Sequence, residues 1–291
     1  MSFRERLRSG EFVVLAEMDT PKGVDISELV TNARKIKGSV DAVVIPDLER
    51  DVMRMSALGA GALMRQQGLE PIINICCRDR NRIALQAELL SAHVLGIHAV
   101  VVAGGGDMSY GDHPDAVPVQ DLGEEELLGA IRKLEQGVDL AGLELKGSPS
   151  FIAGSMIGPS VDDKGLETEL KKAKDKVEAG AAFFISPAVF DLKYFESFME
   201  RAGSLGVPII PTVFLLKSVG IARYIAVNEP GAHLSEETIR RIRKAPDRVR
   251  ECIRIAGETV NALRGLSQGV VIQTLGWEHR LPAILEEAGL A

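Results

Sequence analysis

The amino-acid sequence predicts a single (β/α)₈ barrel, or TIM barrel, and three observations support this fold class. Short apolar runs recur at eight places along the chain, and longer stretches with helical periodicity separate them. The length of 291 residues is also close to the ~250 residues that one such barrel needs. We therefore expect one barrel domain spanning residues 1–291.

Each apolar run is expected to form a parallel strand that is buried on both faces. The runs are apolar throughout and do not alternate with polar residues, which is typical of parallel strands covered on both sides. The expected strands are residues 12–17, 42–46, 71–77, 99–103, 151–156, 182–185, 208–214 and 269–274.

Helices are expected between the strands, and three of them show a clear apolar face that we expect to be buried. In the first, that face is formed by Ile83, Ala87, Leu90 and Val94. In the second it is formed by Leu166, Leu170, Ala173 and Val177. In the third it is formed by Val249, Cys252, Ile253, Ala256, Val260 and Leu263. A glycine follows each of these stretches as a helix stop.

A doubly wound open sheet is the competing architecture. Such a sheet usually carries a glycine-rich phosphate loop between a strand and a helix. The glycines at 104–106 are followed by neither the next glycine of that fingerprint nor an immediate helix. The closed barrel is therefore the favoured fold.

Charge and composition narrow the possible functions. With 34 basic and 41 acidic side chains and a net charge of −7, the chain lacks the basic surface of a nonspecific nucleic-acid binder. No membrane span and no secretory signal are evident, so we expect a cytoplasmic protein. Its cysteines, Cys76, Cys77 and Cys252, are then expected to be reduced thiols. The histidines are not spaced as metal ligands, so no metal site is expected.

Functional side chains of a barrel gather where its strands end. Glu17 ends the first expected strand, where a carboxyl group faces the barrel mouth and can act as a general acid. Asp107 follows three glycines at the end of the fourth, and the turn-rich segment 106–122 lies on the same face. A solvated strand end and a simple turn remain the alternatives for these two residues. For Lys176, near a helix end, position alone predicts a surface lysine.

Three more charged residues follow the second and third expected strands. Asp47 ends the second strand, and Arg78 and Asp79 come directly after the third. Arg78 either reaches a phosphate group of a ligand or pairs with its neighbour Asp79, and the sequence leaves both possibilities open.

Five segments carry a more specific pattern. They are residues 12–23 (FVVLAEMDTPKG), 74–81 (NICCRDRN), 106–114 (GDMSYGDHP), 176–181 (KVEAGA) and 276–282 (GWEHRLP). In this order and spacing they resemble motifs of the bacterial methylenetetrahydrofolate reductase family, over about residues 2–290. The resemblance implies a flavoprotein of one-carbon metabolism and methionine biosynthesis. Such a protein uses FAD, rather than FMN, to reduce methylenetetrahydrofolate to methyltetrahydrofolate.

The resemblance also implies roles for individual residues. Glu17 takes the position of the general acid that assists opening of the folate ring, and Asp107 that of the aspartate beside flavin and pterin. Both are therefore expected to be catalytic and to bind the substrate. Lys176 matches a lysine that contacts the phosphate-bearing tail of the flavin. Glu169 matches an acidic position near the ribityl or ribose hydroxyls, and Asn74 belongs to the third-strand motif at the cofactor.

The chain departs from the family pattern at three positions. Pro187 stands where a glutamine usually contacts the pterin, Pro46 replaces a threonine, and Asn74 replaces a histidine. The substrate is therefore either the folate or a related, modified pterin. The electron donor is either NAD(P)H or a partner redox protein, and we expect a homo-oligomer or a heteromeric complex. The alternatives are a flavin-free pterin methyl-transfer barrel and a non-catalytic barrel subunit that docks a redox partner.

Overall fold

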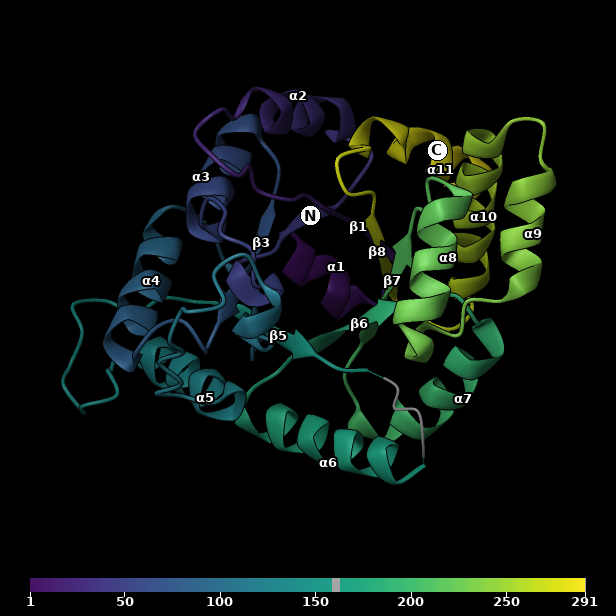
Figure 1. The fold of residues 1–291 in the computed structure, drawn as a ribbon. Coiled ribbons are helices and arrows are strands. Elements are labelled where there is room, and N and C mark those ends of the chain that lie inside the picture. The colour runs from purple at the N-terminus through teal and green to yellow at the C-terminus, as the bar shows by residue number, and fades with distance from the viewer. Residues whose placement is uncertain (159–162, 291) are drawn as a thin grey trace.

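A computed structural model describes residues 1–158 and 163–290, and it shows a closed ring of eight parallel strands (Figure 1). Neighbours along the chain are neighbours in the ring, and the first strand pairs with the last to close it. The predicted (β/α)₈ fold class is therefore confirmed. In the part of the chain that the structure describes, no helix is long and apolar enough to cross a membrane.

The strands coincide with the eight predicted runs. They are β1 (Val13–Glu17), β2 (Ala42–Ile45), β3 (Pro71–Cys76), β4 (Ala99–Ala103), β5 (Ile152–Met156), β6 (Phe183–Ala188), β7 (Ile209–Phe214) and β8 (Gly269–Gln273). Only β6 runs clearly past its predicted end. It continues through Pro187, where the register against β7 shifts between Ser186 and Ala188. A bulge of this kind is where a strand tolerates proline, because the proline nitrogen cannot donate a hydrogen bond.

Most helices surround the ring, and α1 lies across its middle (Figure 1). They are α1 (Phe3–Ser9), α2 (Ser27–Ile36), α3 (Ala57–Gln67), α4 (Arg82–Val94), α5 (Glu124–Glu135), α6 (Asp163–Ala179), α7 (Leu192–Ala202), α8 (Val219–Asn228), α9 (Glu236–Lys244), α10 (Arg248–Leu263) and α11 (Leu281–Glu287). Short 3₁₀ turns add η1 (Leu48–Arg50), η2 (Met108–Tyr110), η3 (Gly203–Leu205), η4 (Pro230–Ala232) and η5 (Glu278–Arg280). Most helices begin at a side-chain cap, as at Ser235, whose hydroxyl accepts from the backbone N–H of Thr238.

Two apolar clusters hold the molecule together. The larger one lies between the strands and the outer helices, and the smaller one fills the inside of the barrel. The inner cluster includes Phe3 of α1, whose ring packs edge-on against Phe183 with the centroids 5.2 Å apart. In Figure 1, α1 lies across the middle of the ring. Its residues contact Glu70 and Ser150, which precede β3 and β5, so α1 closes the barrel at the amino ends of the strands.

The predicted buried face of α4 is wrong. Ile83 and Val94 are 74% and 83% exposed, and the buried residues are Leu85, Leu89 and Ala92. Apolar residues occupy two faces of this helix, so spacing alone could not say which face meets the barrel. The prediction for α10 is confirmed, because its residues from Cys252 to Leu263 in the predicted set are buried.

Candidate active site

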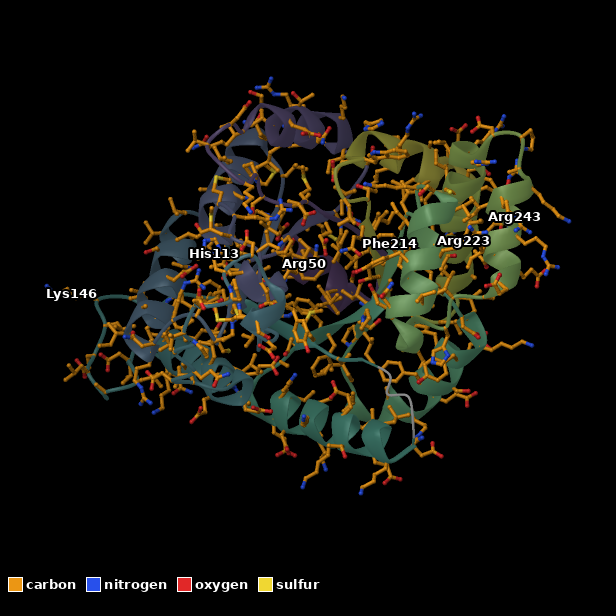
Figure 2. The ribbon with its side chains drawn as sticks, in the orientation of Figure 1. Arg50, His113, Lys146, Phe214, Arg223 and Arg243 are labelled. Atoms are coloured by element: carbon orange, nitrogen blue, oxygen red, sulfur yellow. The ribbon has the colours of Figure 1, made fainter. Side chains whose placement is uncertain are left out.

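A cavity of about 700 Å³ opens where the strands end. This is the size of a small-molecule site, and it lies at the end of the barrel where such enzymes carry out their chemistry. Its walls include Glu17, Asn74, Met156, Ile185, Thr212 and Gln273, which come from six of the eight strands. Figure 2 shows Arg50 over the middle of the ring and Phe214 beside β7, and both residues line the cavity.

Glu17 lies in this cavity, as predicted. Its side chain is 11% exposed. One carboxyl oxygen accepts from Arg50 Nη2 and from Gln273 Nε2, each at 2.6 Å. Arg50 also pairs with Asp19 at 3.2 Å. Burial disfavours the charged form of Arg50, but the carboxylates of Glu17 and Asp19 outweigh it and raise the arginine pKa.

Sequence reasoning missed both partners of Glu17. Gln273 ends β8, so the strand-end rule that selected Glu17 could also have selected Gln273. Arg50 ends the 3₁₀ turn η1, between β2 and α3, and no pattern in the sequence brings it near β1. Only the parallel pairing of β1 with β2 places this turn beside Glu17.

Asn74 is the second predicted residue that lines the cavity. It is 6% exposed, and its Nδ2 donates to Glu49 Oε1 at 2.7 Å. Its own oxygen, Oδ1, is buried and has no hydrogen-bond partner. The second oxygen of Glu49 accepts from the backbone N–H of Asp47 at 2.7 Å. Burial raises the pKa of Glu49 more than the Asn74 hydrogen bond lowers it.

Asp47, which lines the cavity, and charged residues behind it form a paired network. Asp47 is bound by Arg80, with Nη1 and Oδ2 2.6 Å apart, and Arg80 Nε in turn contacts Glu88 at 2.7 Å. Of the two possibilities for Arg78, the structure shows pairing with Asp79, at 2.8 Å. Arg78 also pairs with Asp51 and donates to the carbonyl oxygens of Leu48 and Gly106. This buried guanidinium therefore ties η1 to the loop after β4.

Asp107 lies on the predicted face but outside the residues that line the cavity. Its exposed carboxylate caps η2 by accepting from the N–H of Ser109 at 2.9 Å, which lowers the Asp107 pKa. The preceding glycines allow close packing within the protein. A Cβ at Gly105 would lie 2.8 Å from Cys76 Sγ, and one at Gly106 would lie 2.9 Å from Asp51 Oδ2. At Gly105 and Gly106 the absent side chain therefore leaves room for Cys76 and Asp51 of the same chain.

Lys176 and Glu169 project from α6 toward the end of β5. The position-based expectation of a surface lysine is wrong, because Lys176 is 5% exposed. Its ammonium group pairs with Glu124 at 3.0 Å and donates to the carbonyl of Met156 at 3.1 Å. Glu169 accepts weakly from the N–H of Gly158, at 3.4 Å. Neither side chain lines the cavity, so the structure brings Glu17 and Asn74 together and leaves Asp107, Glu169 and Lys176 apart from them.

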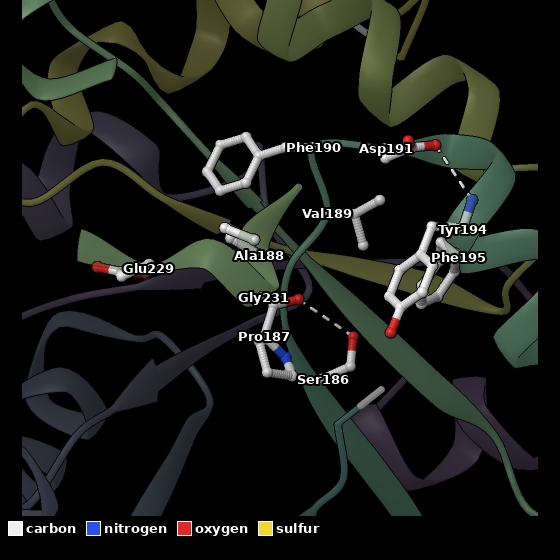
Figure 3. Close-up of a pocket in the computed structure, with 11 residues that line it drawn as sticks. Ser186, Pro187, Ala188, Val189, Phe190, Asp191, Tyr194, Phe195, Glu229 and Gly231 are labelled. Atoms are coloured by element: carbon white, nitrogen blue, oxygen red, sulfur yellow. Dashed lines mark hydrogen bonds between the residues drawn. The ribbon is translucent and has the colours of Figure 1, made fainter. Parts of the chain in front are cut away.

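A smaller hollow of about 290 Å³ continues the cavity beyond β6 (Figure 3). Pro187, Phe190 and Glu229 line both spaces. Figure 3 shows Tyr194 and Phe195 of α7 on the far side of this hollow. Because Pro187 has no polar side-chain atom, the wall at the end of β6 presents mainly apolar surface to a ligand.

Possible metal ligands lie apart from one another in the described part of the chain, and the thiols are buried. Within residues 1–158 and 163–290, no three His, Cys, Asp or Glu side chains are grouped to hold a metal ion. The three cysteines are buried and unpaired, as predicted. Burial raises the pKa of Cys77 to about 12 and that of Cys252 to about 11.

Fold and cavity together define a barrel protein with a cavity of small-molecule size at the carboxyl ends of its strands. Residues 2–289 match the family model described as methylenetetrahydrofolate reductase. The chain belongs to this family, which confirms the resemblance noted in its sequence motifs. No curated protein matches the chain.

Solved structures support the fold alone. A tryptophan synthase structure from M. tuberculosis in space group F222 has a TM-score of 0.52 at 12% identity, covering 98% of this chain and 95% of that chain. The open form of the M. tuberculosis enzyme with BRD0059 bound has a TM-score of 0.51 at 11% identity, with 98% and 94% covered. A putative lyase/mutase from Burkholderia cenocepacia J2315 has a TM-score of 0.50 at 12% identity, with 99% and 85% covered.

Proposed function

We propose that this chain is a flavin-dependent oxidoreductase that reduces methylenetetrahydrofolate, or a related pterin one-carbon carrier, to the 5-methyl form. The observation that carries the proposal is the family match over residues 2–289 together with the position of Glu17 in the cavity. The electron donor is NAD(P)H or a partner protein, and FAD is the proposed flavin. The two further candidates, a flavin-free methyl-transfer barrel and a non-catalytic subunit, have no observation in their favour.

The cavity fits the ring of a flavin. It is large enough for a tricyclic ring, its β6 and β7 walls are mainly apolar, and the unpartnered Asn74 Oδ1 can accept from a ring N–H. The phosphate-bearing tail of the flavin fits less well. Lys176, the cation expected to contact its phosphates, is already paired with Glu124. When bound, the flavin supplies the hydride chemistry, and the protein supplies orientation and charge.

Glu17 is the proposed general acid. Arg50 and Gln273 hold its carboxyl group at the end of β1, so it faces whatever occupies the cavity. A carboxylic acid in this place can protonate the amine nitrogen that leaves when the one-carbon ring opens. Asp107 is proposed to stabilise the cationic iminium, and this role requires the loop after β4 to bring it to the substrate.

The test of Glu17 separates the two half-reactions. Glu17→Gln keeps the shape of the side chain and removes the proton. Flavin reduction by its donor should stay close to the wild-type rate, while flavin reoxidation by methylenetetrahydrofolate should slow by ~10²-fold or more. Stopped-flow absorbance at the flavin band measures both steps. The control is Glu196→Gln, on the exposed face of α7, which should leave both rates unchanged.

Other results would assign Glu17 differently. Equal slowing of both half-reactions would mean that Glu17 positions the flavin, and unchanged rates would remove it from the mechanism. Protein that stays colourless after reconstitution with FAD and with FMN would contradict the flavin itself. If dithionite bleaches the bound flavin and NADH does not, a protein donor becomes the better proposal.

A further inference from the structure

A second cavity lies at the amino end of the barrel, opposite the mouth. Its volume is about 370 Å³, and it is bounded by α1, α5 and the chain that leads into β5, β6 and β7. Much of its wall is apolar, formed by Leu7, Leu128, Ile131, Phe151, Val207 and Pro208. This end of such a barrel usually contributes to stability and not to chemistry. Polar groups left without partners there therefore need a separate explanation.

Three arginines line this cavity, Arg4 and Arg8 from α1 and Arg132 from α5. Arg4 Nη1 donates to Ser150 Oγ at 2.9 Å, and Arg132 Nη1 donates to the carbonyl of Glu178 at 2.7 Å. Among the residues that the structure describes, no carboxylate lies within ion-pair distance of any of the three. The chain has 41 acidic side chains against 34 basic ones, so composition does not account for arginines that lack acidic partners. Each guanidinium group has five N–H donors, and most of these stay available.

Arg4 is the arginine that most clearly lacks a partner. Its Nη2 is buried and has no hydrogen-bond partner. Helix polarity favours Arg8 and Arg132, which lie in the last turns of α1 and α5, but Arg4 lies in a first turn, where a cation is unfavourable. Arg4 and Arg8 are also one turn apart on the same helix, so their charges repel each other. A buried donor without a partner is uncommon and indicates a missing ligand.

The surrounding groups leave this end of the barrel positively charged. Glu135 is the one carboxylate among the described residues that line the cavity, and its Oε1 accepts from the N–H of Phe151 at 2.7 Å. His98, whose carbonyl accepts from the N–H of Ile152, lies beside the cavity. Burial lowers the pKa of His98, and three neighbouring basic side chains, Arg4 among them, lower it further. An anion is therefore the ligand that this place favours.

We propose that the cavity binds a small organic anion, a carboxylate or phosphate group carried on an apolar body. Guanidinium groups bind the oxygens of both anions through paired N–H donors. The apolar wall would bury the body of the ligand, and the volume is within the range of small-molecule sites. An inorganic anion would leave that wall in water, and a neutral compound would leave Arg4 Nη2 without an acceptor. The inference does not depend on the proposed function, because this cavity and the mouth lie at opposite ends.

The experiment compares four compounds by titration calorimetry at constant ionic strength: phenyl phosphate, benzoate, inorganic phosphate and phenol. The full chain should bind phenyl phosphate or benzoate saturably at one site, and the tighter of the two identifies the anionic group. Inorganic phosphate and phenol, which each lack one half of the ligand, should bind at least ~10-fold more weakly. Arg4→Gln removes the charge and should weaken binding of the organic anion roughly 10- to 150-fold. Arg243→Gln makes the same change of charge at an exposed position of α9 outside the cavity, and it should match wild type.

Arg132→Gln provides a second variant, from a different helix, in case Arg4→Gln does not fold. It should also weaken binding of the organic anion, with an unchanged circular dichroism spectrum. Equal affinity of wild type and both variants would overturn the site, and so would the absence of saturable binding by either organic anion. Inorganic phosphate that bound as tightly as phenyl phosphate would also contradict the proposal, because the cavity would then hold an adventitious ion only.

Discussion

Arg50 shows how much of the site depends on a single side chain outside the strands. It contacts both Glu17 and Asp19, so it ties the turn after β2 to the end of the neighbouring strand β1. The strand-end rule located Glu17 in advance because strand positions follow directly from the apolar runs, whereas Asn74 was predicted from the resemblance of its motif to the family. It could not locate Arg50 or Glu49. Both belong to η1, a short turn whose path depends on tertiary contacts such as the pairing of Arg78 with Asp51.

Lys176 illustrates the limit of local reasoning about charge. A lysine near a helix end is usually on the surface, and the sequence contains no sign of the half-buried carboxylate of Glu124 that pairs with this one. Glu124 begins α5 and reaches Lys176 only because α5 and α6 pack side by side. The burial of Lys176 therefore depends on its pairing with a residue of another helix. The spacing of residues along the chain does not reveal this pairing.

An exposed ion pair provides a prediction about pH. Arg82 binds Asp121 through Nε and Nη2, and these bonds lower the pKa of Asp121 to about 2. Because this pKa lies below the unfolded value of about 3.9, the pair stabilises the fold above ~pH 4 and loses its effect as the pH falls toward 2. Relative to Asp121→Asn, wild type should show a Tm advantage of no more than about 2 °C at pH 6.

Thermal unfolding followed by circular dichroism between pH 2 and pH 6 measures that difference. The advantage should shrink below pH 4 and be absent near pH 2, and added salt should reduce it at pH 6. Asp115→Asn, a change in the same long loop, serves as the control. A wild-type advantage that persisted undiminished at pH 2 would contradict the assignment to this ion pair.

Among the elements, α4 separates what periodicity can and cannot predict. Its existence and length follow from the apolar spacing and from the Asn81 cap. The apolar spacing does not predict which face is buried. Ile83 and Val94 recur at helical spacing, and so do Leu85 and Leu89. The eight strands were easier to predict, since a strand buried on both faces requires no choice of side.

The two faces of α4 should respond differently to substitution. Leu85→Ala or Leu89→Ala removes a buried side chain and should lower the free energy of unfolding by about 2–5 kcal/mol. Ile83→Glu and Val94→Lys change exposed positions and should stay within about 0.5 kcal/mol of wild type. Urea unfolding measures both sets. A large loss from Ile83→Glu would mean that a second chain covers this face in solution.

At the scale of the whole molecule, α1 closes the barrel floor opposite the cavity. Its sequence, FRERLRS, is largely charged, so its contribution to the interior was not foreseen. Only Phe3 and Leu7 of this helix are buried, and Phe3 is fully enclosed against Phe183. A charged segment can thus complete a core when two apolar residues lie one turn apart on one face.

Phe3→Ala should therefore destabilise the entire barrel. Loss of a buried aromatic ring typically costs about 3–5 kcal/mol, and the Phe183 ring would lose its edge-on partner. We expect one cooperative urea transition shifted to lower concentration, with flavin and pterin affinity unchanged under native conditions, because the cavity lies at the other end. Phe3→Leu should recover most of the loss. A variant as stable as wild type would show that α1 does not close the floor.

The closed ring also has a consequence for biosynthesis. The pairing of β1 with β8 aligns Val13 with Gly269 and continues to Glu17 and Gln273. On a ribosome that adds about 5–20 residues per second, β8 is made roughly 13–50 s after β1. Until then one edge of β1 has no partner in its own chain and can pair with the same edge of a neighbouring nascent chain. Crowded polysomes should therefore be where this protein most needs a chaperone that covers that edge.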